Sequence, residues 1–253
     1  MELQGRVAVI TGGGGGIGAA VARKFREQGA RAIVLVDRDG AAAERAAAQV
    51  DGWGVGLDVT DEAALAGLAR EVEERWGPID VFFSNAGAGA GGGVEADDAA
   101  WNDQWQLHVM SHVYAARAVL PAMLARGEGY LVHTASAAGL LLAMGSAPYS
   151  VTKAACVKLA EYEAIAYGDQ GIRVSVLCPQ GVNTAMAPRQ LGDGATDGIV
   201  EPQVVADAVV DAMRQERFYI LPHPEVAEYL KRKADDPDRW LAGMRKLRAR
   251  SEQ

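Results

Sequence analysis

The sequence predicts an α/β fold of three layers, in which helices cover both faces of a doubly wound parallel sheet. Short apolar runs alternate with helix-length segments along the chain. The runs lack a polar/apolar alternation, as expected of strands that are covered on both faces, and strand–helix alternation implies right-handed crossovers. The 253 residues contain no internal repeat and no long linker, so we expect a single domain over residues 1–253.

The predicted strands are short and apolar, and cover 6–11, 32–37, 53–57, 79–84, 129–135, 172–177 and 218–221. Helices are expected from the glycine-rich segment to near Gly29, and over 40–50, 61–76, 99–126 and 149–170. Residues 222–253 form a helical tail, with one apolar face made by Trp240, Leu241, Met244 and Leu247. We favour a helix packed on the domain or on a partner subunit, and the alternative is a cover over a substrate pocket.

Composition excludes several classes of protein. A formal net charge of −8 argues against binding nucleic acid, which requires a basic surface. Two cysteines, Cys156 and Cys178, are too few for a disulfide framework. The N-terminus does not resemble a signal peptide, and no apolar run approaches the ~18 residues of a membrane span. We therefore expect a cytoplasmic protein with neither a nucleic-acid nor a membrane partner.

A glycine cluster, residues 12–16, follows the first predicted strand and opens the first predicted helix. Glycines permit a tight turn and let the backbone approach a pyrophosphate, which the N-terminus of the helix then faces. A glycine cluster alone is weak evidence because flexible loops look the same, but this one lies between a strand and a helix. The sequence therefore predicts a dinucleotide site of the Rossmann type.

Asp37 ends the second predicted strand, about 20 residues downstream of the glycines, where an acid accepts hydrogen bonds from the adenosine ribose. Its charge also repels a 2′-phosphate. The adjacent Arg38 has two interpretations: it pairs with a 2′-phosphate, or it stacks on the adenine ring. Since Asp37 comes first and directs its charge at the ribose, we predict NAD rather than NADP.

Several motifs together resemble the short-chain dehydrogenase/reductase family, in the order in which that family carries them over residues 5–185. Besides Thr-Gly-x-x-x-Gly-Ile-Gly at 11–18, they are Asp-Val at 58–59, Asn-Ala-Gly at 85–87, a serine at 136, Tyr-x-x-x-Lys at 149–153 and a segment resembling Pro-Gly-x-Val-x-Thr at 179–184. The resemblance implies these cofactor-binding residues: Gly12, Gly16, Ile17, Gly18, Asp37, Arg38, Asp58, Val59, Asn85, Ala86, Gly87, Tyr149, Lys153, Pro179, Val182 and Thr184.

Two positions depart from the family pattern. Gln180 stands where the family usually has glycine, beside the expected nicotinamide. His108 stands where the family has the asparagine of its catalytic tetrad, in a helix that the family kinks. His108 is either a structural substitute that hydrogen-bonds within the kink, which we favour, or part of a proton relay, for which the ordinary pKa of histidine is suited.

The expected chemistry is oxidation of an alcohol, or reduction of a ketone, by a nicotinamide. The cofactor carries the hydride, and the protein must accept or donate the proton. Tyr149 and Lys153 are i and i+4 on a predicted helix, and a nearby ammonium favours the phenolate. Ser136 is expected to hold the substrate oxygen. The catalytic residues are therefore Ser136, Tyr149, Lys153 and His108, and because His112, His133 and His223 lack metal-ligand spacing, no metal is predicted.

Substrate residues are expected in the loops after the strands, at 88–94, 137–147 and 186–199, with 186–200 as a lid. Leu140, Leu141, Leu142 and Met144 form an apolar wall, which favours a small-to-medium apolar secondary alcohol or its ketone. The alternatives are an NADPH-dependent reductase of carbonyls or acyl thioesters, and a dinucleotide-binding regulatory protein without turnover. The family resemblance also implies a homotetramer or homodimer, assembled through the helices at 99–126 and 149–170.

Overall fold

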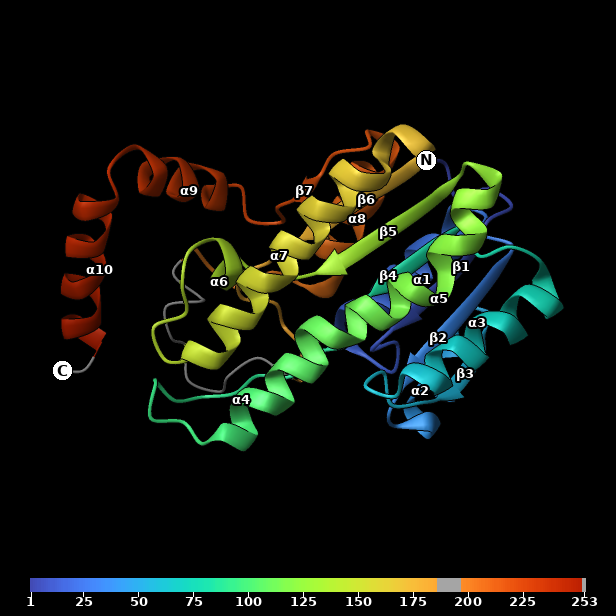
Figure 1. Ribbon diagram of the computed structural model, residues 1–253, viewed down its shortest axis with the longest axis horizontal. Coiled ribbons are helices and arrows are strands. Elements are labelled where there is room, and N and C mark those ends of the chain that lie inside the picture. The colour runs from blue at the N-terminus through green and yellow to red at the C-terminus, as the bar shows by residue number, and fades with distance from the viewer. Residues whose placement is uncertain (186–196, 252–253) are drawn as a thin grey trace.

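The computed structural model describes residues 1–185 and 197–251, and it confirms the predicted fold class (Figure 1). Seven parallel strands form one sheet in the order β3-β2-β1-β4-β5-β6-β7. The strands are β1 (Val7–Thr11), β2 (Ala32–Asp37), β3 (Trp53–Gly56), β4 (Val81–Ser84), β5 (Gly129–Thr134), β6 (Ile172–Leu177) and β7 (Tyr219–Ile220).

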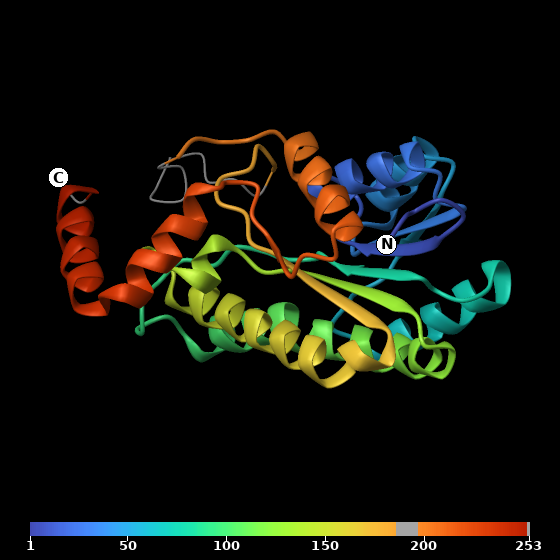
Figure 2. The ribbon, with the colours of Figure 1, turned by 90° about the horizontal axis from the view of Figure 1, so that it is seen from above.

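Helices cover both faces of the sheet (Figure 2). One layer holds α1 (Gly16–Glu27), α2 (Gly40–Ala48) and α8 (Pro202–Arg214). The other holds α3 (Glu62–Trp76), α5 (Ser111–Arg126) and α7 (Ala147–Tyr167). Successive residues of a strand point to opposite faces, so β1 sends Val7 and Val9 into one core and Ala8 and Ile10 into the other. Each fully buried aliphatic side chain contributes about 1.5–3 kcal/mol, so both layers stabilise the sheet.

The structure differs from the prediction in two helices. The expected single helix over 99–126 is interrupted: α4 (Asp98–Trp105) leads into a π-helical turn, η1 (Gln106–Met110), before α5 begins. The extra residue of a π turn changes the helix axis, and such turns are common at functional sites. The helix α8 was not predicted, although Pro202 in its first turn and apolar residues at helical spacing, such as Val205 and Val209, indicate one.

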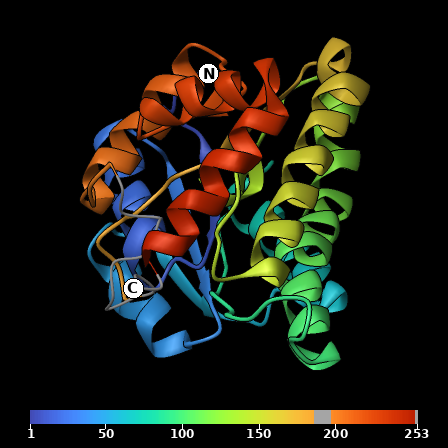
Figure 3. The same ribbon diagram turned by 90° about the vertical axis from the view of Figure 1, so that its left-hand side faces the viewer.

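The remaining elements are the short α6 (Ala137–Leu140), a 3-10 turn η2 (Gly168–Gln170), and the tail helices α9 (Glu225–Asp235) and α10 (Pro237–Ser251). The tail extends beyond the carboxyl ends of the strands (Figures 1 and 3). Of the predicted lid at 186–200, residues 186–196 lie outside the described part of the chain. Within that part, no helix is long and apolar enough to cross a membrane.

A crevice opens where the strand order reverses, between β1 and β4, and polar side chains pin its edges. The buried hydroxyl of Thr11 accepts the backbone N–H groups of Asn85 and Ala86 at 2.9 and 3.0 Å. The Asn85 side chain donates to the Thr11 carbonyl at 3.0 Å and accepts from the Thr134 hydroxyl at 3.0 Å. These contacts join the ends of β1, β4 and β5.

Replacing Thr11 by valine, which has nearly the same shape, should destabilise the fold. Two backbone N–H groups lose their acceptor, at a cost of about 1–3 kcal/mol in the free energy of unfolding. Urea denaturation measures this loss. Thr11→Ser keeps the hydroxyl and is the matched control, so an equal loss in both variants would contradict the importance of the hydrogen bonds.

Candidate active site

A cleft of about 1460 Å³ lies at the carboxyl ends of the strands, and most of the predicted site residues line it. These are Gly12, Gly16, Ile17, Asp37, Asn85, Gly87, His108, Ser136, Tyr149, Lys153, Pro179, Val182 and Thr184. Single ligands typically occupy pockets of about 300–1000 Å³, so the cleft has room for a dinucleotide and a second molecule.

The nucleotide end of the cleft is built by the glycine turn between β1 and α1. A Cβ on Gly18 would lie 2.3 Å from the Gly12 carbonyl oxygen, so the helix reaches the turn only because Gly18 has no side chain. Gly12 has φ +62°, and a Cβ there would lie 2.9 Å from the Ala86 Cα. The turn therefore requires glycine at these positions for the backbone geometry that a pyrophosphate needs.

Asp37 lies beside this turn at the end of β2. Its Oδ2 accepts the backbone N–H of Gly14 at 3.0 Å, which orients the carboxylate toward the cleft that it lines. A carboxylate beside a glycine turn fits the ribose hydroxyls of a dinucleotide, as the sequence predicts. The residues at this end of the cleft therefore fit the nicotinamide dinucleotide that the family resemblance implies.

Five predicted cofactor residues do not line the cleft: Gly18, Arg38, Asp58, Val59 and Ala86. Gly18 and Ala86 lie behind it, Gly18 in close contact with the Gly12 carbonyl and Ala86 partly buried against the core. Val59 is buried in the core, and the Asp58 carboxylate accepts the backbone N–H and the hydroxyl of Thr60, bonds that lower the pKa of Asp58. Their roles in cofactor binding stay predictions.

Three of the catalytic candidates meet in the cleft: Ser136 lies between β5 and α6, and Tyr149 and Lys153 lie on α7. Lys153 is 2% exposed, and its Nζ donates to the Thr134 carbonyl at 2.8 Å. That nitrogen lies 5.7 Å from the centre of the Tyr149 ring, one helical turn away on α7. Ser136 caps α6, its hydroxyl accepting the Ala138 N–H at 3.1 Å. The i,i+4 spacing therefore brings the phenol and the ammonium together.

His108 lies in the π turn η1, fully buried behind Tyr149, whose ring it meets edge-on at 5.4 Å between centroids. Its Nε2 accepts the Ala88 backbone N–H at 3.3 Å, so Nδ1 carries the proton and donates to the Thr152 hydroxyl at 3.1 Å. Burial, and secondarily the Lys153 ammonium, lowers the pKa of His108 to about 2. The neutral imidazole thus connects the loop after β4 to the residue next to Lys153.

A second group of histidines lies deeper in the fold. His112 Nδ1 is 2.8 Å from His133 Nδ1, and His133 Nε2 is 2.6 Å from the buried Glu163 carboxylate. Burial lowers the pKa of His112 well below its ordinary value. The network links α5, β5 and α7 through polar contacts inside the core. Among the residues that the structure describes, no group of three or more potential ligands is arranged to hold a metal ion.

The predicted substrate loops contribute in part. Leu141 and Leu142 line the cleft, whereas Leu140 is buried in the core and Met144 is absent from the lining. The apolar wall predicted from four residues is therefore narrower, because α6 turns Leu140 inward. In the loop after β4, residues 88–91 line the cleft while Val94 is 88% exposed outside it.

Sequence reasoning missed several residues at the cleft. Thr134 and Thr152 hold Lys153 and His108, and Tyr229 of the tail lines the cleft. Thr152 lies within the Tyr-x-x-x-Lys segment, so the sequence could have indicated it as a hydrogen-bonding neighbour of Lys153. No local signal indicates Thr134, since its backbone carbonyl makes the contact. Trp240, Met244 and Leu247 of α10 line the cleft, as the alternative interpretation of the tail as a cover over a substrate pocket expects, and contact of this helix with a partner subunit stays a prediction.

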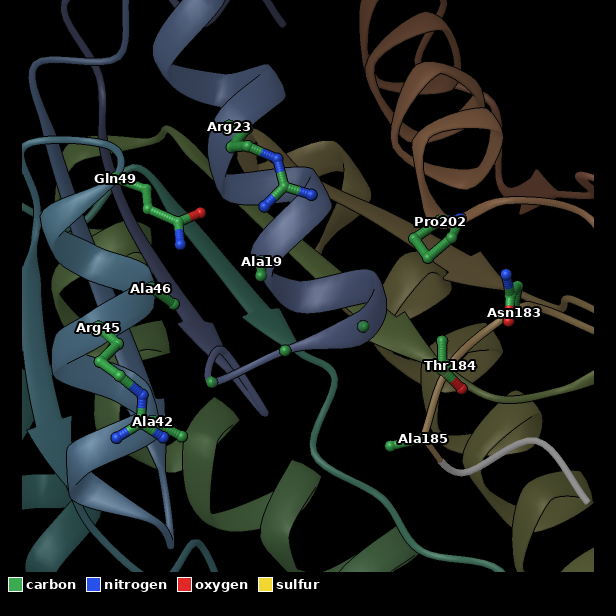
Figure 4. Close-up of a pocket in the computed structure, with 13 residues that line it drawn as sticks. Ala19, Arg23, Ala42, Arg45, Ala46, Gln49, Asn183, Thr184, Ala185 and Pro202 are labelled. Carbon is green, nitrogen blue, oxygen red and sulfur yellow. The ribbon is translucent and has the colours of Figure 1, made fainter.

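A smaller cavity of about 680 Å³ adjoins the cleft behind the glycine turn and shares Gly15, Gly16 and Thr184 with it. Figure 4 shows Arg23 of α1 and Arg45 of α2 on its wall, across the glycine turn from Thr184. Asp37 is not part of this wall. Asp37 on the cleft side of the glycine turn and the two arginines on the cavity side therefore carry opposite charges.

A nucleotide-binding turn followed by a serine, a tyrosine and a lysine in one cleft defines a class of nicotinamide-dependent oxidoreductases. The family model described as short chain dehydrogenase matches residues 6–193. The chain belongs to the short-chain dehydrogenase/reductase family, and it is an oxidoreductase that acts on CH–OH groups.

Two relatives illustrate the range of the family. The chain is 35% identical over 250 residues to 1-deoxy-11-beta-hydroxypentalenate dehydrogenase of Streptomyces exfoliatus, covering 93% of this chain and 90% of the relative. It is 40% identical over 174 residues to the inactive 2-(S)-hydroxypropyl-CoM dehydrogenase 2 of Xanthobacter autotrophicus, covering 68% and 75%.

Solved structures of the family agree with the fold. A short-chain dehydrogenase/reductase from Burkholderia phymatum in complex with NAD aligns with a TM-score of 0.84 and 31% identity, over 94% of this chain and 96% of the other. L-sorbose reductase from Gluconobacter frateurii, complexed with NADPH and L-sorbose, aligns with a TM-score of 0.78 and 28% identity, over 87% and 95%. Neighbours of this fold thus bind either nicotinamide dinucleotide.

The buried, neutral state of His108 has a consequence for stability. The unfolded chain protonates this histidine below its ordinary pKa of 6.5, but the folded state does not until about 2. Its contribution to stability is therefore complete above pH 6.5 and falls, as the pH decreases, by about 1.4 kcal/mol per pH unit. His108→Asn should make the loss of stability with falling pH shallower, while the contribution of buried His112 remains. Urea denaturation at several pH values between about 5 and 7 measures it, and parallel curves for both proteins would contradict the assignment.

Proposed function

We propose that the protein interconverts a secondary alcohol and its ketone with NAD(H), using Tyr149 as the group that accepts or donates the proton. The observation that carries the proposal is the convergence of Tyr149, Lys153 and Ser136 in the cleft that also contains the glycine turn and Asp37. Their common location supports proton transfer next to a bound nicotinamide.

Tyr149, Lys153 and Ser136 have different roles in the proton transfer. A bound nicotinamide supplies or accepts the hydride. The Lys153 ammonium, held by the Thr134 carbonyl, lies beside the Tyr149 ring, so a positive charge stands next to the phenol that exchanges the proton. In the reductive direction the Tyr149 hydroxyl donates the proton. Ser136, nearly buried at the start of α6, orients the substrate oxygen by a hydrogen bond.

His108 acts in this proposal as a positioning residue and not as a relay. Its depressed pKa keeps the imidazole neutral, and both ring nitrogens already have hydrogen-bond partners. It holds the loop after β4 and Thr152 of α7 in place, so that Tyr149 and Lys153 keep their relative position.

We propose NAD as the preferred cofactor. Asp37 lines the cleft at the end of β2, where its charge repels a 2′-phosphate. Arg23 and Arg45 line the neighbouring cavity instead, and they are the candidate phosphate ligands if the enzyme uses NADP (Figure 4). The NADPH-dependent reductase therefore remains the specific alternative.

We also propose that the protein is a homotetramer or homodimer in the cytoplasm. Tyr162 and Ile165 on α7 are 63% and 84% exposed, so this helix presents apolar surface that a second subunit would bury. Cys156 and Cys178 are both unpaired thiols, in keeping with a reducing compartment.

The alternative of a dinucleotide-binding protein without turnover rests on His108. Its support is weak, because His108 keeps hydrogen bonds to both neighbouring segments while Ser136, Tyr149 and Lys153 are all present. Activity measurements on Tyr149 distinguish the two functions.

Tyr149→Phe should lower kcat by about 10²–10⁴-fold, because the variant has no hydroxyl to transfer the proton. NADH binding should persist, since the glycine turn and Asp37 are unchanged. Absorbance at the NADH band, with a panel of secondary alcohols and ketones, measures turnover, and fluorescence titration measures binding. Wild-type turnover that survives in the variant would refute the assignment.

Asp37→Ser should shift the cofactor preference. Losing the charge removes repulsion of a 2′-phosphate and a charged hydrogen bond to the ribose, so the ratio of kcat/KM for NAD to that for NADP should fall about tenfold or more. Arg45→Ala is the control and should leave the ratio unchanged. A wild-type enzyme that prefers NADP, with Arg45→Ala abolishing that preference, would assign the cavity of Figure 4 to the 2′-phosphate.

A further inference from the structure

The tail helices α9 and α10 form the outer side of the active-site cleft. They lie beyond the carboxyl ends of the strands, on the side where α6 and the start of α7 lie (Figures 1 and 3). Tail residues that line the cleft are Tyr229, Arg232, Asp235, Asp236, Arg239, Trp240, Gly243, Met244 and Leu247. The tail thus belongs to the same cavity as Tyr149 and Lys153.

One anchor holds α9 to the catalytic side of the cleft. The Lys233 ammonium donates to the carbonyls of Leu140 and Leu141 at 2.7 and 3.1 Å. These carbonyls end α6, the helix that Ser136 caps at its start. Burial lowers the pKa of Lys233, in agreement with its position under the tail. The contact joins the tail to the segment that carries Ser136.

A second anchor holds α9 to the opposite side, through the residue that departs from the family pattern. Gln180 Nε2 donates to one oxygen of the Asp197 carboxylate at 3.0 Å, and the Tyr229 hydroxyl donates to the other at 2.8 Å. The backbone N–H of Gln180 also donates to His223 at the start of the tail. A glycine at 180 would lack the side chain that makes the first bond, so Gln180 connects the loop after β6 to the tail.

The part of the tail that lines the cleft combines an apolar stripe on α10 with exposed charged side chains at the junction of α9 and α10. Trp240 packs against Tyr229 with 6.4 Å between ring centroids, and Met244 follows one turn later on α10. Leu141 and Leu142 line the same cleft from the other side. The charges at the rim are two arginines and two aspartates, which cancel formally. Leu241, next to Trp240, is 53% exposed and does not line the cleft.

We propose that α9 and α10 form a substrate-recognition wall, and that the enzyme prefers bulky, uncharged, apolar secondary alcohols or ketones whose hydrocarbon body packs between Trp240 and Met244 on one side and Leu141 and Leu142 on the other. Apolar surface buried against this wall supplies binding energy in proportion to its area. A small alcohol reaches Tyr149 without contacting the wall and gains none of it. This inference rests on the proposed function of the cleft.

The test compares a fused-ring secondary alcohol, 2-decalol, with 2-butanol. Trp240→Ala and Met244→Ala should each lower kcat/KM for 2-decalol, about tenfold for Trp240→Ala, with kcat/KM for 2-butanol unchanged. The matched control is Leu241→Ala, which removes an apolar side chain from the same helix outside the cleft and should leave both values unchanged. Since α10 packs mainly on α9, the variants should keep the wild-type unfolding transition.

Tyr229→Phe tests the second anchor separately. It removes the hydroxyl that donates to Asp197 and keeps the ring against Trp240, so selectivity for 2-decalol should fall by less than in Trp240→Ala. Tyr229→Phe should leave the dissociation constant of NADH nearly unchanged, because within the described part of the chain Tyr229 contacts Asp197 and Trp240 and not the glycine turn or Asp37.

A binding measurement separates failure of the wall from failure of the proposed function. Calorimetry with 2-decalone in the presence of NAD, where no hydride is available, measures association without turnover. Weaker binding in Trp240→Ala but not in Leu241→Ala supports the wall even if no alcohol is oxidised. Unchanged selectivity and unchanged binding in Trp240→Ala overturn the inference. A lower mass by sedimentation than the wild type, in both Leu241→Ala and Trp240→Ala, would also overturn it. Such a result would assign the helix to contact with a second copy of the chain.

Discussion

The hydrogen bonds of Thr11, Asn85 and Thr134 hold the edges of the crevice at which the strand order reverses. In a doubly wound sheet the connections from the two central strands lead in opposite directions at this point and leave a crevice between them. The crevice can bind a ligand only if the ends of these strands keep their relative positions. The Thr11 hydroxyl binds two backbone N–H groups of the loop after β4, and Asn85 bridges from β1 to β5. The carbonyl of Thr134, the last link, then binds the Lys153 ammonium. The position of the catalytic helix therefore depends on polar contacts that begin at the first strand.

The π turn at His108 likewise uses hydrogen bonds to hold two segments together. An extra residue in the helix brings the imidazole under the loop after β4, where it binds Ala88 and Thr152 in a single tautomer. A shorter side chain at this position would make one of these contacts and not both. The burial that secures the imidazole also prevents its protonation, which explains why a histidine here serves geometry better than proton transfer. The deeper pair of His112 and His133 continues the polar contacts between α5 and β5 without reaching the cleft.

The tail lies outside residues 6–193, which the family model matches, and it contacts the catalytic part of the chain. Its two anchors, Lys233 and Tyr229, attach on opposite sides of the cleft, to the end of α6 and to Asp197. Gln180, which differs from the family pattern beside the expected nicotinamide, takes part in the second anchor. Cofactor site and substrate wall are thereby linked through a few side chains. An enzyme with this arrangement can change its substrate by changing α10 while the glycine turn and the Tyr149–Lys153 pair remain the same.

The sequence by itself determined the fold class, the seven strands, the glycine turn, Asp37 and the spacing of Tyr149 and Lys153, because these depend on local periodicity and on short-range motifs. Tertiary structure decided the rest. The interruption of the helix at 106–110, the Thr134 carbonyl under Lys153 and the inward turn of Leu140 follow from contacts between segments far apart in the chain. The apolar stripe of α10 was visible in the sequence, but the stripe does not indicate which surface the helix packs against. The anchors through Lys233 and Tyr229 hold α9, and with it α10, at the cleft, because hydrogen bonds between distant residues orient a face that hydrophobicity alone leaves free.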